Sequence, residues 1–72
     1  MKAYTVEYKE YETANVKCIT LLAKNKEDAL DKVWDVFENM LDGGHPYSFW
    51  IAGVTYQNGN YHRFNTHEGK RI

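Results

Sequence analysis

Residues 56–61 read Tyr-Gln-Asn-Gly-Asn-Tyr, an Asn-Gly pair between two runs rich in aromatic and β-branched residues. Asn-Gly supplies the two positive φ angles of a type I′ turn, whose twist matches that of paired antiparallel strands. The stretch therefore predicts a hairpin with strands near 48–57 and 60–66. In the register set by this turn, Tyr56 lies opposite Tyr61.

The first part of the chain predicts a second hairpin. Residues 2–9 alternate between apolar and polar side chains, with Tyr4, Val6 and Tyr8 on one face, which is the pattern of a half-buried strand. Residues 16–23 are β-branched and apolar and form its partner after a polar loop. The sequence does not determine which face of this partner strand is buried, because apolar residues occupy both of its faces.

Between the two hairpins the sequence predicts an amphipathic helix near 26–41. Asn25 is a favourable N-cap, and Asp28, three residues later, suits a capping-box-like arrangement. The apolar residues that follow recur with helical spacing and form one broad stripe. The two glycines within 42–44 suit a left-handed C-terminal cap, and Pro46 prevents continuation of the helix.

These elements predict a single α+β domain over residues 1–72. In this small ββαββ fold, two hairpins form one antiparallel sheet and the helix packs on one of its faces. Residues 67–72 are expected to be a short basic tail. The strand order is left open, since either strand of each hairpin could be central. One helix covers one face only, so the other face meets solvent or a partner.

The predicted register divides the second hairpin into two apolar faces. Phe49, Ile51 and Phe64 lie on the face that we assign to the helix side. The opposite face carries the predicted interaction surface: Trp50, Tyr56, Tyr61 and Arg63. Trp, Tyr and Arg are the residue types that dominate binding energy at protein interfaces, so this face is the candidate site.

An open sheet face with aromatic rings and an arginine is consistent with three uses. The rings could pack on one another and stabilise the hairpin. They could form a protein interface, most simply between two copies of the chain. They could also stack on the bases of single-stranded nucleic acid, although such platforms need more cations than Arg63, Lys70 and Arg71 supply. A protein interaction module, self-associating through this face or an edge strand, is the leading hypothesis.

The charge of the chain is distributed unevenly. The net charge is −1 at pH 7, whereas residues 25–42 carry two lysines against six acidic residues, a net charge of −4. A helix that binds phosphates would carry the opposite charge. An ordinary solvated face explains these acids most simply. A further hypothesis is an acidic-helix mimic that occupies the nucleic-acid groove of another protein.

Cysteine usage and hydropathy bear on the compartment. Cys18 is the single cysteine, which excludes a disulfide within the chain and is typical of a reducing compartment. No apolar leader follows Met1, and no apolar run approaches the roughly 20 residues that span a bilayer. We therefore expect a soluble, cytoplasmic protein without membrane contact.

The sequence contains no complete catalytic motif. His45, His62 and His67 lack the spacing of known metal-binding motifs. Cys18, within an apolar strand, is expected to be a small buried hydrophobic residue. We therefore expect no enzyme activity, no metal and no cofactor. In size and pattern the chain is similar to short proteins carried by phages and other mobile elements, a similarity from which no function follows.

Overall fold

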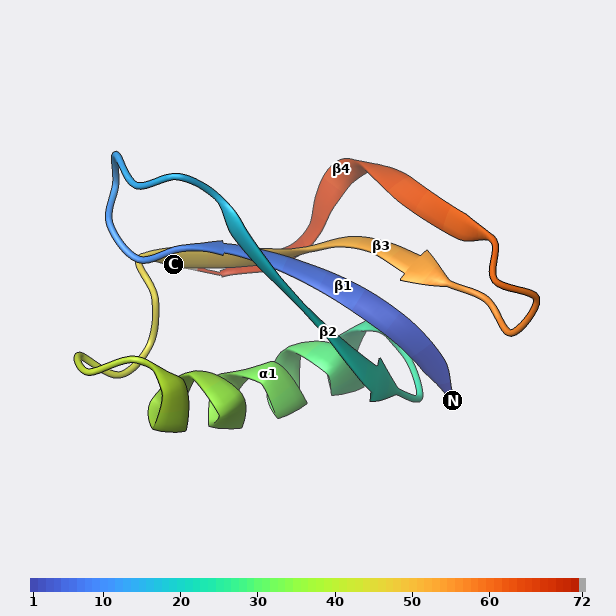
Figure 1. Ribbon diagram of the computed structural model, residues 1–72, viewed down its shortest axis with the longest axis horizontal. Helices are drawn as coiled ribbons and strands as arrows, with labels where there is room; N and C mark the ends of the chain where they lie inside the picture. The colour runs from blue at the N-terminus through green and yellow to red at the C-terminus, as the bar shows by residue number, and fades with distance from the viewer. Residues whose placement is uncertain (72) are drawn as a thin grey trace.

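A computed structural model describes the backbone of residues 1–71 and the side chains of residues 1–65. Four strands form one antiparallel sheet in the order β2-β1-β3-β4, and a single helix packs on it (Figure 1). This confirms the predicted ββαββ fold. The elements are β1 (Lys2–Lys9), β2 (Lys17–Ala23), α1 (Lys26–Met40), β3 (Ser48–Thr55) and β4 (Tyr61–Arg71).

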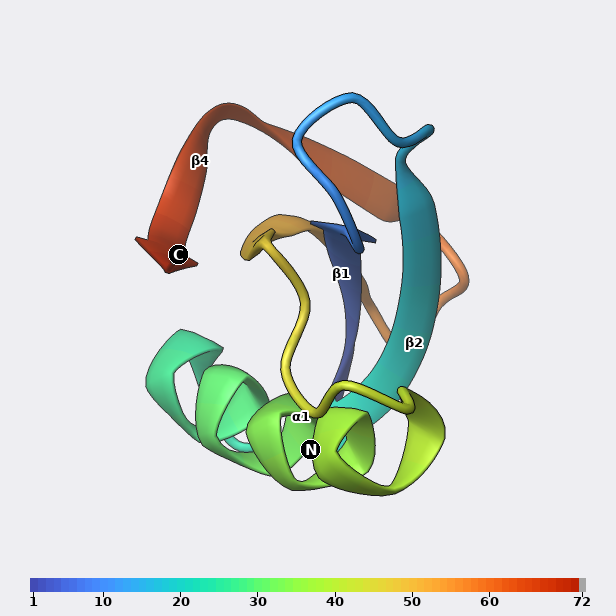
Figure 2. The same ribbon diagram turned by 90° about the vertical axis from the view of Figure 1, so that its left-hand side faces the viewer.

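The strand order answers the question that the sequence pattern left open. The first strand of each hairpin, β1 and β3, occupies the centre of the sheet, and β2 and β4 form its edges. Viewed along the strands, α1 lies on one side of the sheet, while β4 arches over the other side (Figure 2). The two faces of the sheet therefore have different surroundings.

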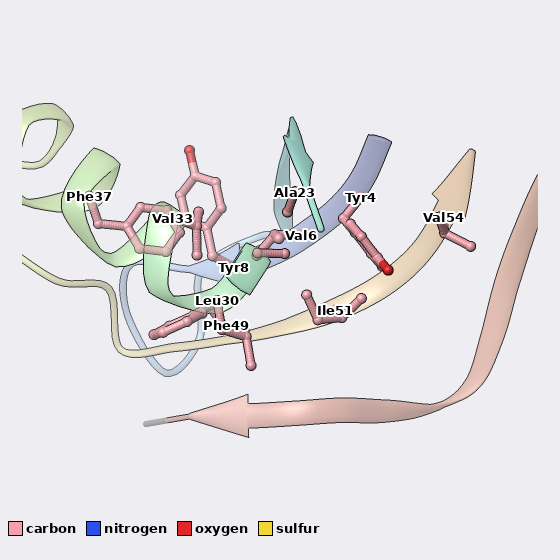
Figure 3. Close-up of a cluster of buried hydrophobic side chains, with 11 residues drawn as sticks. Tyr4, Val6, Tyr8, Ala23, Leu30, Val33, Phe37, Phe49, Ile51 and Val54 are labelled. Carbon is pink, nitrogen blue, oxygen red and sulfur yellow. The ribbon is translucent and has the colours of Figure 1, made fainter. Parts of the chain in front are cut away.

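The core lies between α1 and the sheet (Figure 3). Tyr4, Val6 and Tyr8 of β1 point toward the helix, as their alternation predicts. The aromatic ring of Phe37 lies 4.8 Å from the ring of Tyr8 and 5.2 Å from that of Phe49. The choice of the Phe49 face as the helix side is thus confirmed.

The start of α1 follows the predicted cap. The side-chain oxygen of Asn25 accepts a hydrogen bond of 2.8 Å from the backbone N–H of Asp28. In return, the Asp28 carboxylate accepts a bond of 2.9 Å from the backbone N–H of Lys24. This bond, with help from the Lys32 ammonium 3.3 Å away, lowers the pKa of Asp28. The arrangement ties the end of β2 to the first turn of α1.

The hairpin between β3 and β4 differs from the predicted one. Gly59 has a φ of 88°, but Asn58 does not have a positive φ, so the turn is not type I′. Instead, the N–H of Tyr56 donates to the carbonyl of Asn60 and the N–H of Gly59 donates to the carbonyl of Tyr56, each at 2.9 Å. This is the pattern of a three-residue loop with a left-handed glycine bulge. The predicted pairing of Tyr56 with Tyr61 is wrong by one residue, because Thr55 lies opposite Tyr61.

A second irregularity lies within β3. Gly53 is opposite Thr5 and Ile51 is opposite Val6, so Ala52 is an extra residue in the ladder with β1. The bulge turns Val54 to the helix side, where it joins the core. The turn and the bulge at Ala52 each shift the register by one residue, and the two shifts compensate for each other in β4.

Because of this compensation, the residues of β4 keep their predicted sides. Arg63 lies opposite Gly53, on the side of the sheet away from α1. Phe64 packs against the core on the helix side. The predicted assignment of these two side chains is therefore correct, although the register that led to it is wrong.

The last strand is longer and less regular than predicted. β4 continues to Arg71, so the expected tail at 67–72 is wrong for residues 67–71, and residue 72 lies outside the described residues. Its register with β3 jumps from Arg63 opposite Gly53 to Glu68 opposite Ile51. Between these pairs β4 rises from the sheet on the side away from α1 (Figure 1).

Candidate interaction surface on the open sheet face

The side of the sheet away from α1 is called here the open face. The registers of the three strand pairs align one row of side chains across it. The row consists, in order of the strands, of Leu22, Ala3, Thr55 and Tyr61. Its two ends are large apolar side chains with exposed fractions of 61% for Leu22 and 47% for Tyr61. The open face is therefore apolar at both margins of the sheet.

The position of Tyr61 depends on Gly53. A methyl group at residue 53 would overlap the Tyr61 phenol and would lie 2.6 Å from the carbonyl oxygen of His62. The absence of a side chain at Gly53 is thus what allows the Tyr61 ring to lie against the sheet. The ring covers β3 on one side and leaves its other side to solvent.

Next to Tyr61, three side chains from three strands form a polar cluster. The indole N–H of Trp50 donates a hydrogen bond of 3.0 Å to the carboxylate of Glu7. A guanidinium nitrogen of Arg63 lies 3.6 Å from the same carboxylate oxygen. Trp50 itself is only 6% exposed. Glu7 therefore links a buried ring to a cation that reaches into solvent.

Three of the four predicted interaction residues lie together. Trp50, Tyr61 and Arg63 share the open face, but Trp50 is buried and contributes support more than contact area. Tyr56 lies apart, at the end of the hairpin, with the Lys2 ammonium 5.9 Å from the centre of its ring. The predicted cluster is thus divided between the open face and the turn.

Two residues of this surface, Glu7 and Leu22, are not predicted from the sequence. Glu7 alternates with the buried residues of β1, so its face could be predicted but its partner on β3 could not. The face on which Leu22 lies could not be predicted, because β2 is apolar on both faces. In the structure Ile19, Leu21 and Ala23 lie on the helix side. The outward residues, Cys18, Thr20 and Leu22, are all exposed.

The residues considered for catalysis or metal binding are scattered. Cys18 is exposed, so the expectation that it is buried is wrong. The His45 ring stacks on Trp34 with 3.4 Å between ring centres, while His62 meets the edge of Phe64. The side chain of His67 lies outside the described residues. Within the described residues, no three His, Cys, Asp or Glu side chains come together as a metal site would require.

The chain matches no known protein family, no curated protein sequence and no solved structure. Among the described residues, no helix is both long and apolar enough to cross a membrane.

Proposed function

We propose that this protein is a non-catalytic interaction module that self-associates through the part of its sheet that α1 leaves uncovered. The observation that carries the proposal is the row from Leu22 to Tyr61, which ends in two half-exposed apolar side chains on one face. Fully burying an exposed side chain of this size contributes roughly 1.5–3 kcal/mol, and about half of that remains to be gained at each of these two positions. A second copy would supply that burial.

The surroundings of the row support a protein partner. Trp50, Glu7 and Arg63 hold one another by a hydrogen bond and an ion pair, so this part of the surface loses little conformational freedom on binding. Arg63 has a 65% exposed side chain and can contact a partner without losing Glu7. Protein interfaces combine apolar area with charged residues, as the apolar Leu22 and Tyr61 combine here with Arg63.

The nucleic-acid alternative has less support. A stacking platform needs exposed rings together with a cationic groove. The Arg63 guanidinium lies beside the Glu7 carboxylate, which offsets its charge where the rings are exposed. The hypothesis of an acidic-helix mimic gains no support from Asp28, whose carboxylate bonds to the backbone of Lys24 and lies beside Lys32.

Molar mass by light scattering over a concentration series tests the proposal. We expect a monomer–dimer equilibrium that Leu22→Asn weakens at least tenfold, a factor that corresponds to about 1.4 kcal/mol. The matched control is Tyr11→Asn, which removes a more exposed apolar side chain outside the sheet. A monomer at all concentrations, or an equal effect of both substitutions, would contradict the proposal.

A further inference from the structure

The hydrogen bonds of the β3–β4 turn determine which backbone groups point out of the sheet. The N–H of Tyr56 donates to the carbonyl of Asn60 and its carbonyl accepts from the N–H of Gly59, so the backbone groups of Tyr56 point toward the β4 side. Backbone groups alternate in direction along a strand, so those of Thr55 and Gly53 point to β1. Their partners Ala3 and Thr5 therefore bond to β3.

The same alternation carries across β1 to the edge of the sheet. The backbone groups of Ala3 and Thr5 bond to β3, so the backbone groups of the residues between and beside them bond to β2. Tyr4 is one of these residues, and its partner in β2 is Leu21. The backbone groups of Leu21 then point inward. Cys18, Thr20 and Leu22 alternate with the inward residues, so their backbone groups lie in the plane of the sheet and point outward from its edge.

One side-chain contact supports this assignment independently. The ammonium of Lys32 donates a hydrogen bond of 3.2 Å to the carbonyl of Leu22. Lys32 belongs to α1 and not to β1, so the Leu22 carbonyl accepts from a group outside the ladder between β1 and β2. The outward groups of Cys18 and Thr20 have no comparable partner among the described residues.

We infer that β2 pairs with β2 of a second copy, antiparallel and around a two-fold axis at Thr20. In this register Thr20 exchanges two hydrogen bonds with its counterpart, and Cys18 does the same with Leu22 of the partner subunit. All outward groups of the strand then have partners. The inference rests on the self-association proposed above and assigns the contact to the β2 edge and Leu22, while Tyr61 on the opposite edge strand stays outside it.

The side chains of β2 suit this pairing with itself. Leu22, the most exposed side chain of the row on the open face, would pack against Cys18 of the partner subunit. On the helix side Ile19 would face Leu21 of the partner subunit, and Lys17 would face Ala23 of the partner subunit. No two like charges lie opposite each other within the strand, which is why a second copy fits this edge.

Lys32 is an obstacle to this pairing. It occupies the Leu22 carbonyl that would accept from Cys18 of the partner subunit. Its side chain is 40% exposed and also lies 3.3 Å from the Asp28 carboxylate, so it can leave Leu22 and keep an ionic partner. Lys32→Met should therefore strengthen dimerisation several-fold. Lysines at the edges of sheets commonly prevent unwanted pairing with another strand.

Disulfide trapping tests the register directly. The design is Thr20→Cys in a Cys18→Ser background. Residues opposite each other across the axis have Cα atoms about 5.5 Å apart, within the range of a disulfide. The matched control is the native chain, whose two Cys18 residues would be four positions apart along the pair, roughly 13 Å. We expect covalent dimer in the double variant and not in the native chain.

A proline substitution provides the second test. Thr20→Pro removes an N–H that points outward, so the chain should keep its fold by circular dichroism and lose its dimer in light scattering. Thr20→Val, which keeps the N–H, should still dimerise. Equal trapping of the native chain, or a dimer that persists in Thr20→Pro, would overturn the pairing at β2. If that persistent dimer is lost in Tyr61→Ala, self-association stands and the contact is the open face. A monomeric native chain would overturn both.

Discussion

The two edges of the sheet differ in regularity. β2 runs beside β1 without a shift, from Ala23 opposite Lys2 to Lys17 opposite Tyr8. β4 follows β3 with two register shifts and an arch. Bulges and bends protect an edge because they prevent another strand from pairing along its length. Irregular geometry therefore hinders pairing along β4, whereas β2 is regular and has the Lys32 side chain at its Leu22 carbonyl.

The largest expected effect comes from a proline that enters the ladder between β1 and β2. Leu21→Pro removes an inward N–H and leaves its acceptor in β1 unpaired, which costs about 1–3 kcal/mol in addition to the lost packing of Leu21. Thr20→Pro changes an outward N–H and should cost far less. Urea unfolding of both variants measures the difference. Equal losses would mean that the alternation of backbone groups along β2 is assigned incorrectly.

The irregular edge should be sensitive to a single methyl group. Gly53→Ala places a Cβ where the Tyr61 phenol and the His62 carbonyl lie, and accommodating it should cost about 1–3 kcal/mol. Because the Tyr61 ring must move, its fluorescence and its ring proton shifts should change as well. The control is Ala52→Gly, the neighbouring position in the same bulge. An unchanged melting temperature in Gly53→Ala would show that the ring is not held against the sheet.

A smaller effect is expected where β2 meets α1. Asn25→Ala removes the acceptor for the Asp28 N–H and should lower the free energy of unfolding by about 1 kcal/mol. Asn25→Ser, which keeps a capping oxygen, should restore most of the loss. Thermal unfolding of both variants measures the cap. If Ala and Ser behave alike, the helix does not depend on this residue.

The smallest effect concerns acid. Hydrogen bonding from Lys24 and the charge of Lys32 lower the pKa of Asp28 in the folded state. The stability that this carboxylate adds is therefore present above its ordinary pKa and is lost as the pH falls through the lowered value. In Asp28→Asn, the dependence of the melting temperature on pH below about 4 should be weaker. An unaltered acid profile would contradict this assignment.

Local signals were sufficient to predict the elements. The cap at Asn25 and the alternation in residues 2–9 act within a few positions, and the structure confirms both. The register of the second hairpin could not be predicted in this way, because Asn-Gly suits two kinds of turn that both need a left-handed glycine. In this turn, the Asn58 side chain accepts from the N–H of Asn60 at 3.0 Å, which helps to hold the longer loop.

The candidate site was harder to predict than the fold because it depends on neighbours far apart in the chain. The bulge at Ala52 becomes visible only when β1 lies beside β3. The burial of Trp50 and its bond to Glu7 depend on that same pairing. Residues 67–71 show no strand alternation, and they are ordered as a strand by pairing with β3. These features follow from tertiary contacts that no short window of sequence contains.

The central position of β1 and β3 also determines when the protein can fold. Ala3 pairs with Thr55, so the middle of the sheet joins residues from nearly opposite ends of the chain. Contacts of this kind form late, because closing a long loop costs entropy before any pairing is gained. During synthesis, β1 and β2 leave the ribosome well before β3, and until β3 arrives β1 has a second unpaired edge beside its apolar face. Pairing with β3 then covers this edge.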